Sequence, residues 1–491
     1  MRRAAALLAF AATLAGCEVG PNYVAPADHP PPAFIETAPT GDPGDLASWW
    51  HVFGDPELDR LVEIALRQNL DVQTAVSRVK EARLGVTIAR SQALPSLTAQ
   101  GQAAHSDVKD TVHLNTAAID HEIGQAFGRP LNLPSTLKLP DASENSYTAG
   151  LDASWQIDVF GGIRRSVEAA RARTEAAQWS ARDAQLTVVS EVADAYLQLR
   201  QYQAQEAVAA AEIQRQTRSL QILGETAKVG LVPQGDFARQ RAQLATAQAS
   251  LPPLIANERI QIHALGVLVA QTPESLSAEL TPARPDPALP PTVPPGLPSE
   301  LLRRRPDIRS AERNLAAATA DIGVAVADLY PKFSITGALN WMSMAFGNIA
   351  TITGRTGQAA GAVSFPILDW GRRRATVGQR KEEAQQSYLA YQQAVLGALR
   401  DVEDALARAA TEQTRNAALR SGVADAERAV QAVDARYRTG VTGYTDVLDA
   451  QQQLLQLRDS LAASDGNLRR DLIALYRALG GGWDDAKLPA R

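Results

Sequence analysis

The sequence predicts a mostly helical protein with a small β part, built as a tandem repeat. Three observations lead to this prediction. Residues 150–251 match residues 360–461 at an offset of 210, the stretch before them matches at an offset of 236, and two very long stretches lack proline. The matches include residues typical of the ends of helices and strands. At the offset of 210, Trp155, Ile157 and Gly161 match Phe365, Ile367 and Gly371. At the offset of 236, Asp71, Pro95 and Gly101 match Asp307, Pro331 and Gly337. Self-similarity at a fixed offset marks a duplicated architecture. The two offsets differ by 26 residues, which places an insertion between Gly101 and Gly150.

The N-terminus has the pattern of a lipoprotein signal peptide at residues 1–16. Arg2 and Arg3 precede an apolar run too short to cross a bilayer as a helix, and Leu14-Ala15-Gly16 precedes Cys17. Cys17 is the single cysteine, so no intramolecular disulfide can form. We expect export and an acylated Cys17 at the start of the mature chain. An ordinary signal peptide with an incidental cysteine is the alternative, and Glu18 weakly favours the outer membrane as the destination.

Composition argues against several classes of function. The net charge of −5 gives no basic surface that would point to nucleic acid as a partner. Aromatic residues make up 5 % of the chain, which is typical of long helices rather than of a β-sandwich or an α/β enzyme. After the signal, no stretch approaches the roughly 20 apolar residues of a membrane helix. A membrane crossing by the mature chain would therefore have to use β-strands.

The first repeat, residues 56–280, follows an extended proline-rich lead at residues 17–55. Asp55 caps its first helix, Pro56 occupies the first turn and Glu57 favours the positive end of the helix dipole. A second helix is expected from about Asp71 to Ala93. The second repeat covers residues 299–480, after a proline-rich linker at 281–298 and before a C-terminal tail at 481–491.

Four segments alternate apolar and polar residues with a period of two, which predicts strands in two hairpins. They are residues 94–104, 146–158, 331–342 and 357–368. Strands of this length with one apolar face suit a membrane barrel. Four strands cannot close around a lumen, so closure would need several chains.

Each hairpin leads into a very long helix. Residues 162–228 and 371–442 contain no proline, and about 67 helical residues extend about 100 Å. Their apolar positions form a narrow stripe of small side chains, which predicts coiled-coil-like packing. A partner helix returns after each one, giving long helical hairpins at 162–271 and 371–480. Asp158 and Asp369, at the strand–helix junctions, are expected to cap the helix starts.

The two helix turns share one pattern of a basic residue, a glycine and an aspartate. It is Lys228, Gly230 and Asp236 in the first repeat, and Arg438, Gly440 and Asp446 in the second. Glycine allows the turn at a helix end, and aspartate stabilises the start of the returning helix. Capping alone would explain the pattern; a functional role for the turns is the other interpretation.

The insertion carries three histidines and three aspartates. They are His105, His113, His121, Asp107, Asp110 and Asp120. Histidine spacings of eight match no compact metal motif, so a solvated loop is favoured over a metal-responsive one. We expect no metal site and no cofactor apart from the lipid on Cys17.

Taken together, these features resemble the TolC-like outer-membrane efflux proteins, most closely the lipidated OprM/NodT-type branch that works with RND pumps. The resemblance covers essentially the whole mature chain. It is carried by the Cys17 signal, Trp49-Trp50, Phe53-Gly54-Asp55-Pro56-Glu57-Leu58, the duplicated unit, Arg303-Arg304-Arg305-Pro306-Asp307-Ile308, Tyr330-Pro331, Val229-Gly230-Leu231 with Asp236, and Tyr437-Arg438-Thr439-Gly440 with Asp446-Val447-Leu448-Asp449-Ala450.

The resemblance implies a homotrimer. Three chains of four strands would form one 12-stranded β-barrel in the outer membrane, and the long helices would continue it as an α-helical barrel across the periplasm. It also implies a passive exit duct for drugs or other small molecules. A periplasmic membrane-fusion adaptor would connect the duct to an inner-membrane RND-type pump that supplies the energy.

The resemblance places both helix turns at the periplasmic tip. The residues that would contact the adaptor are Lys228, Gly230, Leu231, Arg438, Gly440 and Val441, and the channel gate would comprise Asp446, Asp449, Tyr437 and Asp236. Asp446 and Asp449 share a helix face, so a trimer would stack two rings of carboxylates that attract cations and narrow the pore. In the first repeat, Arg239 occupies the position that matches Asp449 of the second repeat, so the second ring of carboxylates is not repeated there. A hydrogen bond from Tyr437 to Asp236 would lock the tip. Where TolC has a latching arginine this chain has Thr442, so Arg438 or Lys228 would have to substitute.

Two other functions stay open. One is a type I secretion exit duct, and the other is a non-channel lipid-anchored periplasmic coiled-coil scaffold. The apolar-faced strand hairpins disfavour the scaffold, and the lipid signal favours small-molecule efflux. No nucleophile–base pair, phosphate loop or ligand cluster is present in the sequence, so we do not expect an enzyme.

Overall fold

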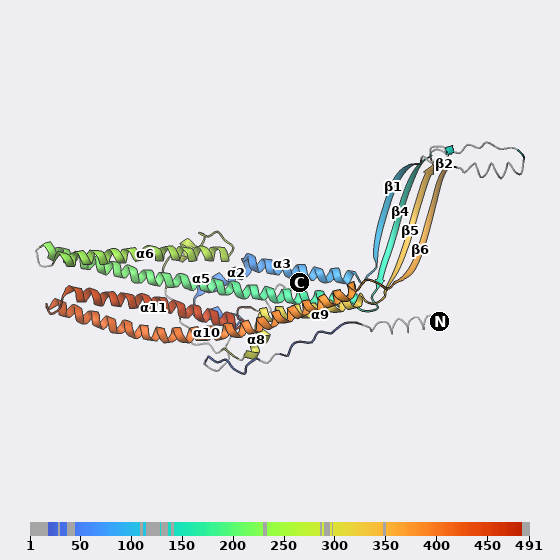
Figure 1. The fold of residues 1–491 in the computed structure, drawn as a ribbon. Helices are drawn as coiled ribbons and strands as arrows, with labels where there is room; N and C mark the ends of the chain where they lie inside the picture. The colour runs from blue at the N-terminus through green and yellow to red at the C-terminus, as the bar shows by residue number, and fades with distance from the viewer. Residues whose placement is uncertain are drawn as a thin grey trace. The chain divides into compact units, whose positions relative to one another are not determined.

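The computed structural model describes residues 18–27, 30–36, 45–108, 111–113, 128, 136–138, 142–228, 233–284, 287–288, 295–296, 298–346 and 350–483 (Figure 1). Cys17, Gly230, Leu231 and His121 therefore lie outside the described residues. The chain divides into two compact units. The strand unit comprises Met1–Asn22, Val86–Glu168 and Ala320–Lys381, and the helical unit comprises Tyr23–Gly85, Ala169–Thr319 and Glu382–Arg491.

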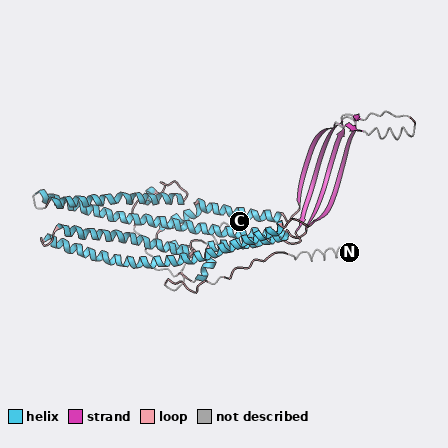
Figure 2. Ribbon diagram, in the orientation of Figure 1, coloured by secondary structure: helices cyan, strands magenta, loops and turns pink. Residues whose placement is uncertain are grey.

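The strand unit contains a four-stranded antiparallel sheet in the order β1-β4-β5-β6, drawn in magenta in Figure 2. Its strands are β1 (Ser96–Val108), β4 (Ala142–Ile157), β5 (Lys332–Phe346) and β6 (Ala350–Ser364). The strands begin just after Pro95 and Pro331, and they extend further toward the hairpin ends than the alternation of the sequence indicated. A short pair, β2 (Thr111–His113) and β3 (Thr136–Lys138), lies within the insertion, where we expected no strands.

The two hairpins have the same register. Ser96 lies opposite Ser154 in the first, and Lys332 lies opposite Ser364 in the second. These pairs are related by the sequence offsets of 236 and 210. The duplication found in the sequence is therefore reproduced residue by residue in the strand pairing, and β4 and β5 join the two repeats in one sheet.

The long helices also occur as two matched pairs. Helices α5 (Gly162–Lys228) and α10 (Arg372–Arg438) each have 67 residues, and α6 (Gln234–Leu268) and α11 (Tyr444–Ala478) each have 35. Helix α6 continues through Pro252 and Pro253. None of the helices within the described ranges is both long enough and apolar enough to cross a membrane.

Aspartate side chains cap three helix starts, as the sequence predicted. The Asp55 carboxylate accepts a bond from the Glu57 amide at 2.9 Å before α2 (Pro56–Gln68). Asp158 accepts from the Arg164 amide at 2.9 Å, and Asp369 accepts from the Gly371 amide at 3.1 Å. The remaining helices are η1 (Trp49–Phe53), α3 (Leu70–Ser91), α7 (Ser277–Leu280), α8 (Pro298–Arg304) and α9 (Pro306–Ala327).

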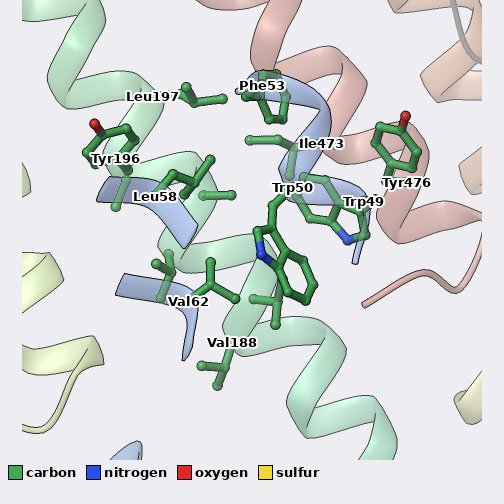
Figure 3. Close-up of a cluster of buried hydrophobic side chains, with 14 of the residues drawn as sticks. Trp49, Trp50, Phe53, Leu58, Val62, Val188, Tyr196, Leu197, Ile473 and Tyr476 are labelled. Atoms are coloured by element: carbon green, nitrogen blue, oxygen red, sulfur yellow. The ribbon is translucent and has the colours of Figure 1, made fainter. Parts of the chain in front are cut away.

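The core of the helical unit gathers around the aromatic residues of η1 (Figure 3). Trp49 is fully buried and stacks on Tyr476 of α11 at 5.1 Å between ring centroids. Tyr196 of α5 donates its hydroxyl hydrogen to Asp55 at 2.6 Å. Each buried aromatic side chain removes about 150–250 Å² from water, which is worth about 4–6 kcal/mol at 25 cal/mol per Å². The Trp49-Trp50 and Asp55 motifs therefore hold the middle of the long helices together.

Candidate functional site: the tip of the helical hairpins

The α10–α11 turn is built around one glycine. Gly440 has a φ of +74°, its amide donates to the Tyr437 carbonyl at 2.9 Å, and the Val441 amide donates to the Arg436 carbonyl at 3.0 Å. This pair of bonds is a Schellman motif, which ends a helix with a residue in the left-handed conformation. Val441 is left 65 % exposed at the turn. The α5–α6 turn, with Gly230 and Leu231, lies outside the described residues.

The basic residues that sequence reasoning singled out pair within their own helices. Lys228 contacts Glu225 at 2.8 Å and Arg438 contacts Asp434 at 2.7 Å. Both basic side chains are more than 70 % exposed, so these pairs contribute at most about 1 kcal/mol each. Within the part of the chain that the structure describes, neither residue is engaged as a latch between the hairpins.

At the tip, Arg239 reaches from one hairpin to the other. Its Nη1 donates to the Thr445 hydroxyl at 3.0 Å and lies 3.7 Å from the Asp236 carboxylate. Sequence reasoning did not assign it a role as a link. The available signal was its departure from the repeat, because Arg239 occupies the position that matches Asp449.

Asp446 and Asp449 are both exposed in the first turns of α11. The Thr442 hydroxyl bonds to the Asp446 carboxylate, so Thr442 and Asp446 together close the turn. Asp236 has the equivalent place in the first turn of α6. Asp236 and Asp446 lie in first turns, where a carboxylate favours the helix dipole, but the N-cap residues Pro233 and Gly443 make no side-chain cap bond. A role in a gate stays a prediction.

Tyr437 packs at the tip through its ring. The ring lies 5.4 Å from that of Tyr444 at an angle of 53°. It borders a small apolar cluster made of Leu223, Tyr444, Val447, Leu448, Phe237 and Val433. Among the described residues of one chain, the partner of Asp236 is Arg239, and Tyr437 makes no hydrogen bond to Asp236. The proposed Tyr437 lock is therefore not formed within a single chain.

A buried chain of hydrogen bonds joins the two hairpins just behind the tip. Tyr444 of α11 donates to Gln240 of α6 at 2.7 Å, Gln240 donates to the Gln216 carbonyl of α5 at 3.0 Å, and Gln216 donates to Glu212 at 2.6 Å. Gln240 is fully buried and Tyr444 is 9 % exposed. Burial raises the pKa of the Tyr444 hydroxyl, which keeps it a donor. We call these four hydrogen-bonded residues the Tyr444 network.

Further polar contacts join α11 to the first hairpin along its length. Gln243 donates to Gln452 at 3.4 Å, Gln205 donates to Asp459 at 3.0 Å, and Arg470 pairs with Asp194 at 2.6 Å. The two helical hairpins of one chain are therefore connected from the tip toward the core.

The structure also fixes the segment that follows the expected lipid-bearing cysteine. Val19 donates its amide to the Phe160 carbonyl at 3.2 Å, and Arg165 donates to Asn22 at 2.6 Å. Gly20 has a φ of +92°, and a Cβ atom there would lie 2.5 Å from the Cα of Gly323. A glycine at position 20 therefore allows the lead to lie directly against α9.

The described residues contain no group of three or more His, Cys, Asp and Glu side chains placed to hold a metal ion. His105 contacts the Asn145 side chain at 2.8 Å. His121 lies outside the described residues, so the absence of a metal site in the insertion stays a prediction.

Comparisons with known proteins agree on one family. A family model described as outer membrane efflux protein matches residues 61–265 and 297–481. Nodulation protein T of Rhizobium leguminosarum bv. trifolii is 32 % identical, over 97 % of this chain and 96 % of its own. Outer membrane protein OprJ of Pseudomonas aeruginosa is 28 % identical, over 98 % and 96 %. The cation efflux system protein CusC of Escherichia coli O157:H7 is 28 % identical, over 97 % and 98 %.

Solved structures show the same fold. The outer-membrane channel OprN superposes with a TM-score of 0.81 at 32 % identity, covering 95 % of this chain and all of that one. The open state of the MtrE outer membrane channel of Neisseria gonorrhoeae gives 0.75 at 26 % identity, covering 95 % and 98 %. The fold class predicted from the duplicated sequence is confirmed. The chain belongs to the outer membrane efflux protein family, and it is a channel component of the outer membrane rather than an enzyme.

Proposed function

We propose that the protein is the exit duct of a tripartite efflux system. Three copies would form the duct, each anchored through an acylated Cys17 and extending into the periplasm. A membrane-fusion adaptor would connect it to an inner-membrane RND-type pump, and the cargo would be drugs or other small molecules. The observation that carries the proposal is the joining, twice in one chain, of a strand hairpin to a helical hairpin of 67 and 35 residues.

The free edges of the sheet support assembly from several copies. Strands β1 and β6 are the outer strands of the four-stranded sheet, so each has one edge that pairs with no other strand among the described residues. Apolar side chains are also exposed on the sheet. They include Leu97, Tyr147, Ile335, Trp341, Ile352 and Val363. Pairing of β6 with β1 of a neighbouring copy removes both edges when three copies close the ring.

The tip residues fit a gate and a docking surface in such a trimer. Asp446 and Asp449 would each occur three times, forming two rings of like charge that favour cations. Lys228, Gly230, Leu231, Arg438, Gly440 and Val441 would meet the adaptor. The exposed Val441 side chain supports this assignment, because an apolar residue at the outermost turn gains from being covered.

Single-channel current across a planar bilayer tests the duct and the gate together. We expect discrete cation-selective steps from the wild type. In an Asp446→Ala/Asp449→Ala variant the steps should grow and lose selectivity, because the carboxylate rings are gone. Asp425→Ala, an exposed carboxylate on α10, is the matched control and should behave as the wild type does.

The recording can refute the carboxylate gate and the duct separately. Steps that are indifferent to the double substitution would keep the duct and remove the carboxylate gate. No current from any variant, despite confirmed insertion, would refute the duct itself.

A further inference from the structure

The two faces of the four-stranded sheet differ in polarity. Successive residues of a strand point to opposite faces, and the strand registers show which residues share a face. One face is apolar, and its large side chains include Leu97, Leu151, Trp155, Ile335, Leu339 and Val363. The other face is polar and includes Gln100, Asp152, Asn340 and Gln358. We call the first of these the apolar face.

The apolar face ends at one row of residues. Tyr147 on β4 and Trp341 on β5 are its last large side chains toward the hairpin ends, and both are exposed. Beyond them the residues on this face become polar, namely Asn145, Ser343 and Thr353. Tryptophan and tyrosine gather where a membrane protein meets the lipid headgroups. The row therefore has the composition of a membrane surface, on the side of the sheet away from the helices.

Arg355 on β6 is the charged residue in this row. Between the row and the helix ends of the strands, the described residues of the apolar face include no other charged side chain. Arg355 lies directly opposite Trp341 and is exposed. It borders a groove that Tyr147 and Ser343 also line. Among the described residues its guanidinium has no hydrogen bond and no ion pair, so its donors are available to a ligand.

The position of Arg355 along β6 agrees with a headgroup site. Val363 and Arg355 are eight residues apart, or about 27 Å at about 3.4 Å per residue. A strand tilt of about 35–45° leaves about 19–22 Å of that length along the membrane normal, where a lipid-facing apolar band is about 25 Å tall. A lipid-facing arginine is strongly unfavourable at the middle of a bilayer and nearly neutral at its surfaces. Arg355 is therefore placed near the far surface of the band.

The part of β6 that follows Arg355 on the apolar face lacks large side chains. It consists of Gly357, Ala359 and Gly361. A Cβ atom at Gly361 would meet nothing within 4 Å, and one at Gly357 would meet only Leu339 at 3.7 Å. We call these three residues the smooth strip. Larger side chains of β5 border it, because Leu339 lies opposite Gly357 and Ile335 lies opposite Gly361. Its shape suits an extended acyl chain that runs down from Arg355.

We propose that Arg355 and Trp341 bind the phosphate headgroup of a lipid A molecule in the outer leaflet, with an acyl chain along the smooth strip. The inference rests on the proposed function, because it requires the sheet to cross the outer membrane while the helices extend into the periplasm. The planar guanidinium matches phosphate oxygens through two parallel hydrogen bonds. An indole ring at the same level packs among headgroups. A free phosphate ion would gain only the first of these contacts.

Titration of the full-length protein in detergent with diphosphoryl lipid A tests the site, with bound lipid counted by native mass spectrometry. Arg355→Gln should weaken binding by about tenfold or more, because charge-assisted hydrogen bonds are lost. Arg355→Lys keeps the charge and should weaken binding less. Equal affinity in the wild type and Arg355→Gln would overturn the proposal.

The matched control moves the charge to the other face of the same strand. In Arg355→Gln/Thr356→Arg the arginine returns at the next position, which belongs to the polar face. Binding should stay as weak as in Arg355→Gln. Recovery of wild-type affinity in this variant would refute a site on the apolar face.

The phosphate and the acyl chain can be tested separately. Lipid A stripped of its phosphates should bind the wild type and Arg355→Gln equally, and excess inorganic phosphate should not displace diphosphoryl lipid A. Displacement would identify a site for free anions and overturn the lipid proposal. Gly357→Leu should weaken binding by filling the smooth strip, whereas Gln358→Leu, on the polar face, should not. Equal affinity in these two variants would refute the strip.

The same spectra keep this proposal apart from the proposed function. A monomer that binds lipid A through Arg355 would refute the homotrimer and support the site. A trimer that forms channels but binds lipid independently of Arg355 would leave the duct standing and remove the site. Unchanged lipid binding in Arg355→Gln, together with a lower temperature of trimer dissociation, would instead assign Arg355 to a contact with a neighbouring copy.

Discussion

The Tyr444 network leads to a quantitative prediction about the stability of the tip. Tyr444→Phe removes one oxygen atom and keeps the ring that packs against Tyr437 and the surrounding apolar cluster. The lost hydroxyl is the donor to the Gln240 side-chain oxygen at 2.7 Å, and Gln240 is fully buried. Because the phenyl ring cannot donate, that oxygen would be left without a hydrogen bond.

The size of the effect follows from this burial. An acceptor left unsatisfied in a protein interior costs about 1–3 kcal/mol. Such a change corresponds to a shift of about 5-fold to 150-fold in an equilibrium. We therefore expect local separation of α11 from α6 at the tip to become more frequent by a factor in that range.

Amide hydrogen exchange measures this separation in the purified, full-length protein. Amides of the first turns of α11, residues 445–450, should exchange faster in Tyr444→Phe by the factor given above. Tyr388→Phe is the control, because the Tyr388 hydroxyl accepts from Gln392 at 2.9 Å at an exposed site on α10. Equal exchange rates in the wild type and Tyr444→Phe would refute the idea that this chain of hydrogen bonds holds the hairpins together.

Two further predictions concern pH and the N-terminal lead. Burial and the neighbouring Glu258 raise the pKa of Glu206 to about 7, so the folded protein binds this proton more tightly than the unfolded chain does. The contribution of Glu206 to stability is therefore present at acidic pH and is lost as the pH rises toward and through 7. Glu206→Gln should raise the thermal unfolding temperature relative to wild type more at pH 8 than at pH 5. An equal rise in unfolding temperature at the two pH values would contradict the reasoning. The control is the exposed Glu382→Gln, and the same pH-dependent rise in that variant would also contradict it. Gly20→Ala should displace the lead from α9, because its Cβ would lie 2.5 Å from the Gly323 Cα, and limited proteolysis should then cleave residues 18–36 faster. Gly85→Ala, where a Cβ meets nothing within 4 Å, should keep the wild-type cleavage rate, and wild-type resistance in Gly20→Ala would argue against a tightly seated lead.

Much of the fold could be predicted because the repeat preserves residues with strong local preferences. Gly161 and Gly371 both have φ near +80° at the strand–helix junctions, and Asp158 and Asp369 cap the helices that follow. These effects act within a few residues, so the sequence alone reveals them. Because both strands of each hairpin follow the repeat offsets, the two hairpins share one register.

The contacts between hairpins could not be predicted in the same way. Tyr444 and Gln240 are 204 residues apart, and neither residue is repeated: their equivalents are Gln234 and Ala450. The sequence leaves Lys228 or Arg438 as the substitute latch, but each has an acidic residue three or four positions earlier on its own helix. Such local pairs require little chain ordering, so they form in preference to a distant partner. The persistence of α6 through Pro252 and Pro253 likewise depends on packing that local rules do not include.

The divergence of the two copies at positions 239 and 449 has an electrostatic consequence. The first repeat has Arg239 where the second repeat has Asp449, although both residues lie in the first turns of helices of equal length. Around the proposed trimer, positive and negative side chains would alternate at six equivalent sites. The electrostatic potential around the tip would then have three-fold rather than six-fold periodicity. A single substitution at position 239 or 449 would change this potential at every second site.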